Sequence, residues 1–163
     1  MFLNTFEIFY FVTIFNNKNN NCMENKKMTM ALFSGSIDKL TAAGVVLSGA
    51  AADDMEVDVY VLLQGARAFK KEIANNTDLL NMAENPNLKE EFMQSLQNLK
   101  VKPWLDFFKE AKELTSVKIH ICGLAGKIWG GEKIEDFVDI ADDIVGIGEY
   151  ITSAQEADVH LFI

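Results

Sequence analysis

Short apolar runs alternate with longer amphipathic segments along most of the chain, and this alternation predicts an α/β fold. The runs Met28 to Phe33 and Ser116 to Cys122 are rich in apolar and β-branched residues and stop at a glycine or serine turn, as buried strands do. Between such runs, apolar residues recur at helical spacing, most clearly from Pro103 to Leu114. The predicted strands are 28–33, 56–63, 116–122, 143–146 and 158–163, and the predicted helices are 36–53, 88–99, 103–114 and 148–157.

Repeated alternation of strands and helices favours parallel strands with helices on both faces. We therefore expect a three-layer sandwich with a mostly parallel sheet of about five strands, formed by residues 28–163. The polar segment 75–87 interrupts the alternation and is expected to be a long loop with short helical pieces. Residues 132–137 are expected to form one or two helical turns.

Residues 1–27 differ from the rest of the chain and are predicted to be an extension outside this domain. Met1 to Phe15 is apolar and rich in phenylalanine, and 16–21 is almost entirely asparagine. The apolar run is shorter than the roughly 20 residues that cross a bilayer, and it lacks the basic start and cleavage site of a signal peptide. Three interpretations remain: an extension of unknown role, a weak membrane-surface anchor, or translated upstream sequence with the true start at Met23, Met28 or Met30. We favour the last, because this composition is typical of translated AT-rich non-coding sequence.

The charge balance argues against one broad class of function. The 163 residues include 24 acidic and 15 basic ones, which gives a formal net charge of −9. Binding to a phosphate backbone needs a basic face, so we expect no nucleic-acid partner and, for the same reason, no anionic membrane. The two cysteines, Cys22 and Cys122, are too few for a disulfide scaffold and fit a reducing cytoplasm, where we expect the protein to reside.

Cys122 is the leading candidate for chemistry, because ligands of open parallel sheets bind beyond the carboxyl ends of the strands. It ends a predicted strand and precedes Gly123-Leu-Ala-Gly126. The free N–H groups of a helical turn at that point would stabilise a thiolate, and Lys127 could reach the same place. Such a thiolate is able to attack sulfane sulfur or to hold a persulfide. The alternative is a buried structural cysteine, since free cysteine is among the most buried residue types.

Two other loops at the same sheet edge offer weaker candidates. Ser34-Gly35-Ser36 follows the first predicted strand. Arg67, the only arginine in the chain, follows the second strand and is suited to bind an oxyanion with two hydrogen bonds. Its alternative role is that of a solvated surface arginine.

Neither a metal nor a cofactor is predicted. His120 and His160 show no ligand spacing with the cysteines that would hold zinc. Gly146-x-Gly148 is half of a dinucleotide fingerprint, which a tight turn explains equally well. The acidic pairs at 53–54 and 142–143 are interpreted as solvated caps at element ends.

From residue 117 onward the predicted elements follow a definite layout: a strand ending in cysteine, a glycine-bearing loop, a helix with Glu-Asp, a strand with glycine, a short helix and a closing strand with Ala-Asp and Leu-Phe-Ile. These parts are Cys122, Gly130-Gly131, Glu135-Asp136, Val145-Gly146, Ile151 to Ala154 and Ala157 to Ile163. The layout resembles that of the DsrE/DsrF-like proteins. Residues 36–52, followed by Met55-Glu56-Val57, are similar to that family's first helix and second strand, so the resemblance extends over about 28–163.

The resemblance implies a three-layer α/β fold that assembles as homo- or hetero-oligomers and serves cytoplasmic sulfur trafficking. The cysteine at the position of Cys122 would carry sulfur as a persulfide or thiosulfonate and exchange it with small sulfur-carrier proteins and rhodaneses. Some relatives have a second cysteine where this chain has Trp129-Gly130-Gly131, so an internal two-cysteine relay is not expected. Some relatives are loosely called peroxiredoxin-like, but this chain has no peroxide-reducing motif.

The sequence thus favours a sulfur-transfer protein, in which Cys122 is both acceptor and donor of sulfur. The alternative is a non-catalytic oligomeric module that binds a small ligand or assembles with a partner, and a third possibility is nucleotide or flavin binding at the same edge. A homo-oligomer is expected because short strands with apolar edges need to be covered. The residues expected to bind substrate or to stabilise the anionic sulfur are Ser34, Gly35, Arg67, Gly123 and Lys127.

Overall fold

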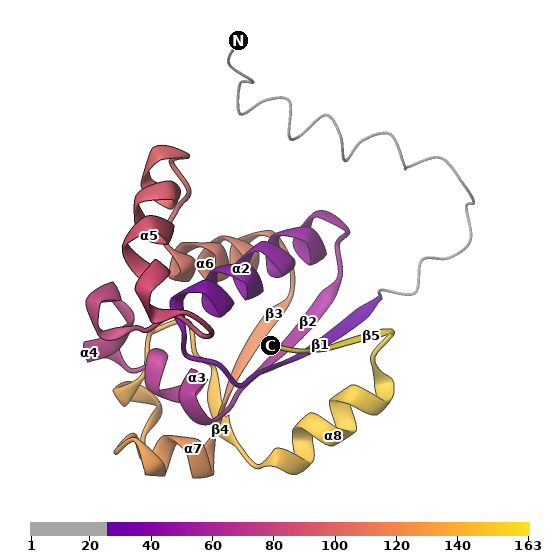
Figure 1. The fold of residues 1–163 in the computed structure, drawn as a ribbon. Coiled ribbons are helices and arrows are strands. Elements are labelled where there is room, and N and C mark those ends of the chain that lie inside the picture. Colours follow the sequence, from indigo (N-terminus) through magenta and orange to yellow (C-terminus); the bar gives the residue numbers. More distant parts are fainter. Residues whose placement is uncertain (1–25) are drawn as a thin grey trace, which may run out of the picture.

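A five-stranded sheet runs through the centre of the computed structural model, which describes residues 26–163 (Figure 1). All neighbouring strands pair in parallel, which confirms the predicted sheet. The alternatives for the N-terminal extension, and Cys22 with them, fall outside the described residues. The strands are β1 (Lys27–Leu32), β2 (Glu56–Val61), β3 (Val117–Cys122), β4 (Asp143–Val145) and β5 (Val159–Phe162).

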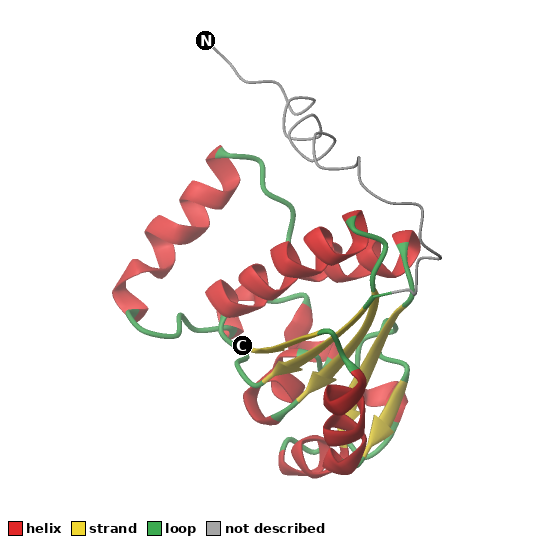
Figure 2. Cartoon of the chain, turned by 90° about the vertical axis from the view of Figure 1, so that its right-hand side faces the viewer, coloured by secondary structure: helices red, strands yellow, loops and turns green. Residues whose placement is uncertain are grey.

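Helices cover both faces of the sheet, which confirms the three-layer sandwich. Helices α2 and α6 lie side by side on one face, and α8 lies on the other (Figures 1 and 2). No helix within 26–163 combines the length and the apolar character needed to cross a bilayer. The α-helices are α2 (Ile37–Ala52), α3 (Leu63–Ala68), α4 (Lys71–Ala74), α5 (Lys89–Asn98), α6 (Trp104–Leu114), α7 (Gly123–Ile128) and α8 (Ile147–Glu156), with 3-10 turns at Thr77–Leu79, Pro86–Leu88 and Ile134–Asp136.

The strand order is β4-β3-β2-β1-β5, so the direction in which successive strands are added to the sheet reverses once. The connections from β1 to β4 advance across the sheet in one direction, and α8 then carries the chain back to the far side of β1. Right-handed crossovers explain why α8 lies on the opposite face from α2. The point at which the strand order reverses therefore lies between β1 and β5. There the N–H groups of Phe33 and Ser34 donate to the carbonyl of Ile163 at 2.7 and 3.2 Å.

The two faces of the sheet differ in chemistry, because side chains alternate along each strand. On the face toward α2 and α6, the strand residues are apolar and buried, among them Met30, Val59 and Ile119. The opposite face carries most of the strands' polar residues, including Asp58 and His120. The polar and ionisable side chains of the strands therefore lie mostly on the face that α8 covers.

Two glycines of α2 provide a matched test of the packing between α2 and α6. A Cβ atom on Gly44 would lie 2.6 Å from Cβ of Phe107, whereas one on Gly49 would have nothing within 4 Å. We expect Gly44→Ala to lower the free energy of unfolding by about 1–3 kcal/mol, because the helices must separate. Gly49→Ala is expected to raise it by about 0.5–1 kcal/mol through helix propensity. Urea denaturation of both variants checks the prediction, and equal effects would contradict the close approach.

Candidate functional site at the carboxyl edge of the sheet

Cys122 is a free, half-buried thiol at the carboxyl end of β3. It occupies the residue before α7, with φ −66° and ψ 121°, and its side chain makes no capping hydrogen bond. The register of the sheet pairs it with Val145 of the edge strand β4. A Cβ atom on Gly123 would lie 3.3 Å from Cγ2 of Ile144, so β4 packs closely against the Cys122–Gly123 turn.

The loops after β1 and β2 meet at this same edge, backbone against backbone. A Cβ atom on Gly35 would lie only 2.2 Å from the carbonyl oxygen of Gln64, so this position requires glycine for a close approach. The hydroxyl of Ser34 is 2.8 Å from that of Ser36 and accepts a hydrogen bond from the Ser36 N–H. Ser34 and Gly35 are thus held in a fixed loop.

The two predicted cations lie farther along the short helices that begin at this edge. Arg67 is in the last turn of α3, where Nη1 donates to the Leu79 carbonyl at 3.2 Å and the guanidinium lies 5.9 Å from the Trp129 ring centre. Lys127 is exposed in the last turn of α7. Within residues 26–163, neither cation makes a hydrogen bond or ion pair with Cys122. A role for either at the thiol stays a prediction.

Exposed apolar side chains gather where the strands end. Leu63 follows β2, Leu124 follows β3, Ile147 follows β4 and Phe162 ends β5, and between 46% and 69% of each is exposed. Phe33, which follows β1, lies against Phe162 with ring centres 4.5 Å apart. We call these five residues the apolar edge. Exposed apolar side chains concentrated at one edge are typical of sites that bind another protein or an apolar ligand.

A buried polar cluster beneath α8 was not predicted from the sequence. His120 is 7% exposed, and its Nδ1 donates to Oδ1 of Asp143 at 2.6 Å. Its Nε2 lies 3.6 Å from Oδ1 of Asp58, and its ring stacks on Tyr60 with centres 4.8 Å apart. The imidazole therefore joins strands β2, β3 and β4 through two carboxylates.

Asp58 has further partners from other elements. Its Oδ2 lies 3.1 Å from Nζ of Lys27 and accepts a hydrogen bond of 2.9 Å from Ser153 of α8. The Ser153 hydroxyl also lies 2.7 Å from that of Thr29. This cluster is the main polar attachment of α8 to the sheet.

The cluster shifts the ionisation of its members. The contact with the imidazole of His120 is the main cause that lowers the pKa of Asp58 from its ordinary value; burial opposes it, and Ser153 and Lys27 add to the lowering. Burial alone would lower the pKa of His120, but the carboxylates of Asp58 and Asp143 outweigh it and raise that pKa above 6.5. The two carboxylates therefore favour the imidazolium form of His120.

The acidic pair Asp142-Asp143 does more than the solvated cap expected of it. Oδ2 of Asp142 accepts the Ile119 N–H at 2.7 Å and pairs with Nζ of Lys112 at 2.5 Å, while Asp143 holds His120. The signal available in the sequence was the charged residue inside each of two apolar strands, but only the register of the sheet shows that these residues meet. His160, the other histidine of the chain, is exposed.

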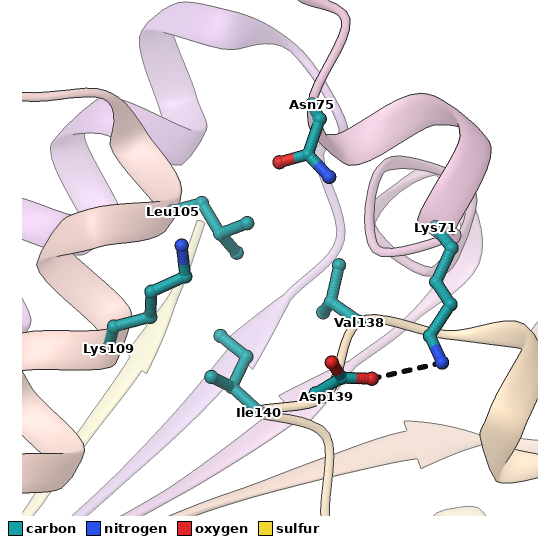
Figure 3. A pocket seen from close by; sticks show the side chains of 7 residues that line it. All are labelled: Lys71, Asn75, Leu105, Lys109, Val138, Asp139 and Ile140. Carbon is teal, nitrogen blue, oxygen red and sulfur yellow. Dashed lines mark ion pairs between the residues drawn. The ribbon is translucent and has the colours of Figure 1, made fainter.

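Two hollows of about 290 Å³ each are lined by residues other than Cys122. Figure 3 shows the first, between α4, α6 and residues 138–140, with an ion pair of 2.9 Å between Lys71 and Asp139. The second lies beside Lys70, whose Nζ is taken up by Glu72 and by the Trp129 carbonyl. Because much of their charge is already paired, these hollows are weaker candidates than the sheet edge.

No family model matches the chain. A protein of Bacillus subtilis (strain 168), called uncharacterized protein YrkE, is 26% identical to it over 163 residues. The match covers 86% of this chain and 98% of that protein.

Proposed function

We propose that this protein is a cytoplasmic sulfur-transfer protein of the DsrE/DsrF-like kind, and that Cys122 carries the sulfur. The observation behind the proposal is the free, half-exposed thiol at the carboxyl end of a parallel strand, beside exposed apolar side chains. Ligands of such sheets bind at that end. Ser34 and Gly35 lie at the same edge. The residues proposed to bind substrate are Ser34, Gly35, Arg67, Gly123 and Lys127.

The chemistry is a pair of thiolate displacements. The Cys122 thiol loses its proton to water, and the thiolate attacks the sulfane sulfur of thiosulfate. A new S–S bond forms, the S–S bond of thiosulfate breaks, and sulfite leaves with the bonding electrons. An acceptor thiolate then attacks the outer sulfur of the Cys122 persulfide, which breaks the bond to Cys122 and regenerates its thiolate. With tetrathionate the first step leaves a thiosulfonate on Cys122 and releases thiosulfate.

The apolar edge is the surface that would meet a donor or acceptor protein. A small sulfur-carrier protein or a rhodanese has to bring its own cysteine within bonding distance of Cys122. Exposed side chains such as Leu124 and Ile147 would be buried in that encounter. Another copy of the chain, in a homo-oligomer, is the second kind of partner that the proposal includes.

A second candidate function is a non-catalytic assembly or ligand-binding module of the same fold. The apolar edge favours it equally, because such a surface serves binding whether or not the thiol reacts. In that case Cys122 would be covered in the assembled protein and inert to small alkylating reagents.

Intact-mass spectrometry after exposure to thiosulfate, tetrathionate or polysulfide tests the proposal. The Cys22→Ser variant, in which Cys122 is the sole thiol, is expected to gain one or more sulfur atoms and to lose them on addition of a reductant. With thiosulfate, a poor sulfur donor to ordinary thiols, the matched Cys122→Ser variant, which retains Cys22, is expected to gain nothing. An unmodified Cys22→Ser protein, alongside a small-molecule thiol that does react, would refute the proposal.

A further inference from the structure

Strand β4 has an unusual attachment to the sheet. It is three residues long, lies at the edge and pairs only with β3. Its own side chains are at most half-buried, with Ile144 and Val145 packed against the core. Consecutive carboxylates add polar contacts: Asp142 to the Ile119 N–H and Lys112, and Asp143 to His120.

The Asp143 contact depends on charge. A protonated imidazole offers an N–H to each of the two carboxylates, whereas either neutral tautomer turns one nitrogen lone pair toward a carboxylate oxygen. Asp58 is 18% exposed in its side chain and Asp143 is 52% exposed. The contact with Asp143 is the shorter of the two, 2.6 Å against 3.6 Å for Asp58, and loss of the ring proton changes it from a charge-assisted to an ordinary hydrogen bond, which is roughly half as strong.

Asp58 is also anchored from more sides than Asp143. Lys27 and Ser153 stay in contact with Asp58 when His120 becomes neutral. Within residues 26–163, His120 is the only side-chain partner of Asp143. Tyr60 on β2 is the ionisable group that stacks on the ring, and the same elements also carry Lys118 on β3 and Glu149 and Glu156 on α8.

We propose that protonated His120 holds strand β4 against the Cys122–Gly123 turn through Asp143, and that loss of this proton weakens the contact, loosens β4 and increases the access of solvent to the Cys122 thiol. The backbone connects the two places directly, because Val145 pairs with Cys122 two positions after Asp143 pairs with His120. The role of this clamp in controlling sulfur chemistry rests on the proposed function, but the clamp itself does not. His120 acts here as a positioning residue and takes no part in the reaction.

Hydrogen exchange of the wild-type protein between pH 6 and 8.5 tests the clamp. After correction for the intrinsic rate, amides in 141–150 are expected to exchange at least about tenfold faster at the higher pH, while those of α2 keep their protection. Asp143→Ala is expected to show the fast exchange already at pH 6. Glu149→Gln, which removes one negative charge from the same segment, is expected to behave as wild type. Corrected exchange in 141–150 that does not change with pH in the wild type would overturn the proposal.

Alkylation of the thiol gives an independent readout in the Cys22→Ser background. At pH 6, adding Asp143→Ala is expected to speed alkylation of Cys122 several-fold, and the two rates should converge at pH 8.5. Comparison at one pH removes the ordinary dependence of the thiolate fraction on pH. Equal rates at pH 6 would overturn the proposal. Neither readout involves sulfur donors, so this proposal and the proposed function fail separately.

Discussion

Replacing Asp58 by alanine is expected to lower the free energy of unfolding by about 2–4 kcal/mol near pH 6, because it removes the carboxylate that His120 and Lys27 share. This loss is somewhat smaller than for breaking a completely buried ion pair, because the side chain of Asp58 is 18% exposed. Urea denaturation of wild type and variant, followed by circular dichroism, measures the difference.

The pH dependence of that difference follows from the two shifted groups. The pKa of Asp58 is lowered, chiefly by its contact with His120. Its contribution to the free energy of unfolding is therefore complete above the pKa of the unfolded state and is lost as the pH falls through the pKa of the folded state. Burial lowers the pKa of His120, but the two carboxylates outweigh it and raise that pKa. The contribution of His120 to the free energy of unfolding is therefore complete below about pH 6.5, the pKa in the unfolded chain, and is lost as the pH rises through the pKa of the folded state. The stability difference is therefore expected to peak between about pH 4.5 and 6.5.

An exposed acid provides the control for Asp58. Asp139 is paired with Lys71, but its side chain is 90% exposed. Asp139→Ala is expected to change the free energy of unfolding by less than about 0.5 kcal/mol at any pH. A difference for Asp58→Ala that stays flat from pH 4 to 9 would show that the cluster does not titrate in this way.

Gly35→Ala is expected to lower the free energy of unfolding by about 3 kcal/mol, the upper end of the cost of overpacking. The added methyl group would lie 2.2 Å from the carbonyl oxygen of Gln64 and 2.8 Å from its carbonyl carbon. Because both are backbone atoms, no side-chain rotation relieves the overlap, and the loops after β1 and β2 must separate. The same denaturation experiment measures this loss.

Gly148→Ala is the matched substitution, because a Cβ atom there has nothing within 4 Å and the residue lies in α8. It is expected to leave the free energy of unfolding unchanged or to raise it by up to about 1 kcal/mol. If both alanine variants were equally stable, the loops would not be in the contact described.

The sequence was sufficient for the elements that are long or strongly apolar. Strand β3 and helix α6 are recognisable because each has a single clear period of apolar residues and a glycine, proline or polar residue at its end. Helix α3 and helix α4 were missed because four to six residues are too few to show a period. Helix α7 was anticipated only as a possible turn after Cys122, for the same reason.

The site was only partly predictable. Cys122 was identified because its place at the end of a strand depends on local sequence alone. The meeting of Asp58, His120 and Asp143 depends on the strand order and on the register of three strands, which no local pattern contains. The contacts of Arg67 with Leu79 and Trp129 depend in the same way on how loops fold back over the sheet.

The position of β5 beside β1 has a consequence for how the molecule forms during synthesis. Each of the first four strands can join the sheet soon after it leaves the ribosome, since its neighbour has just been made. The pairing of β1 with β5 has to wait: the Lys27 N–H and the Asp158 carboxylate that it binds are separated by 131 positions. Until that partner arrives, one border of β1 and the polar side of the sheet stay open to other nascent chains. Chaperone dependence should therefore concentrate in this interval of translation.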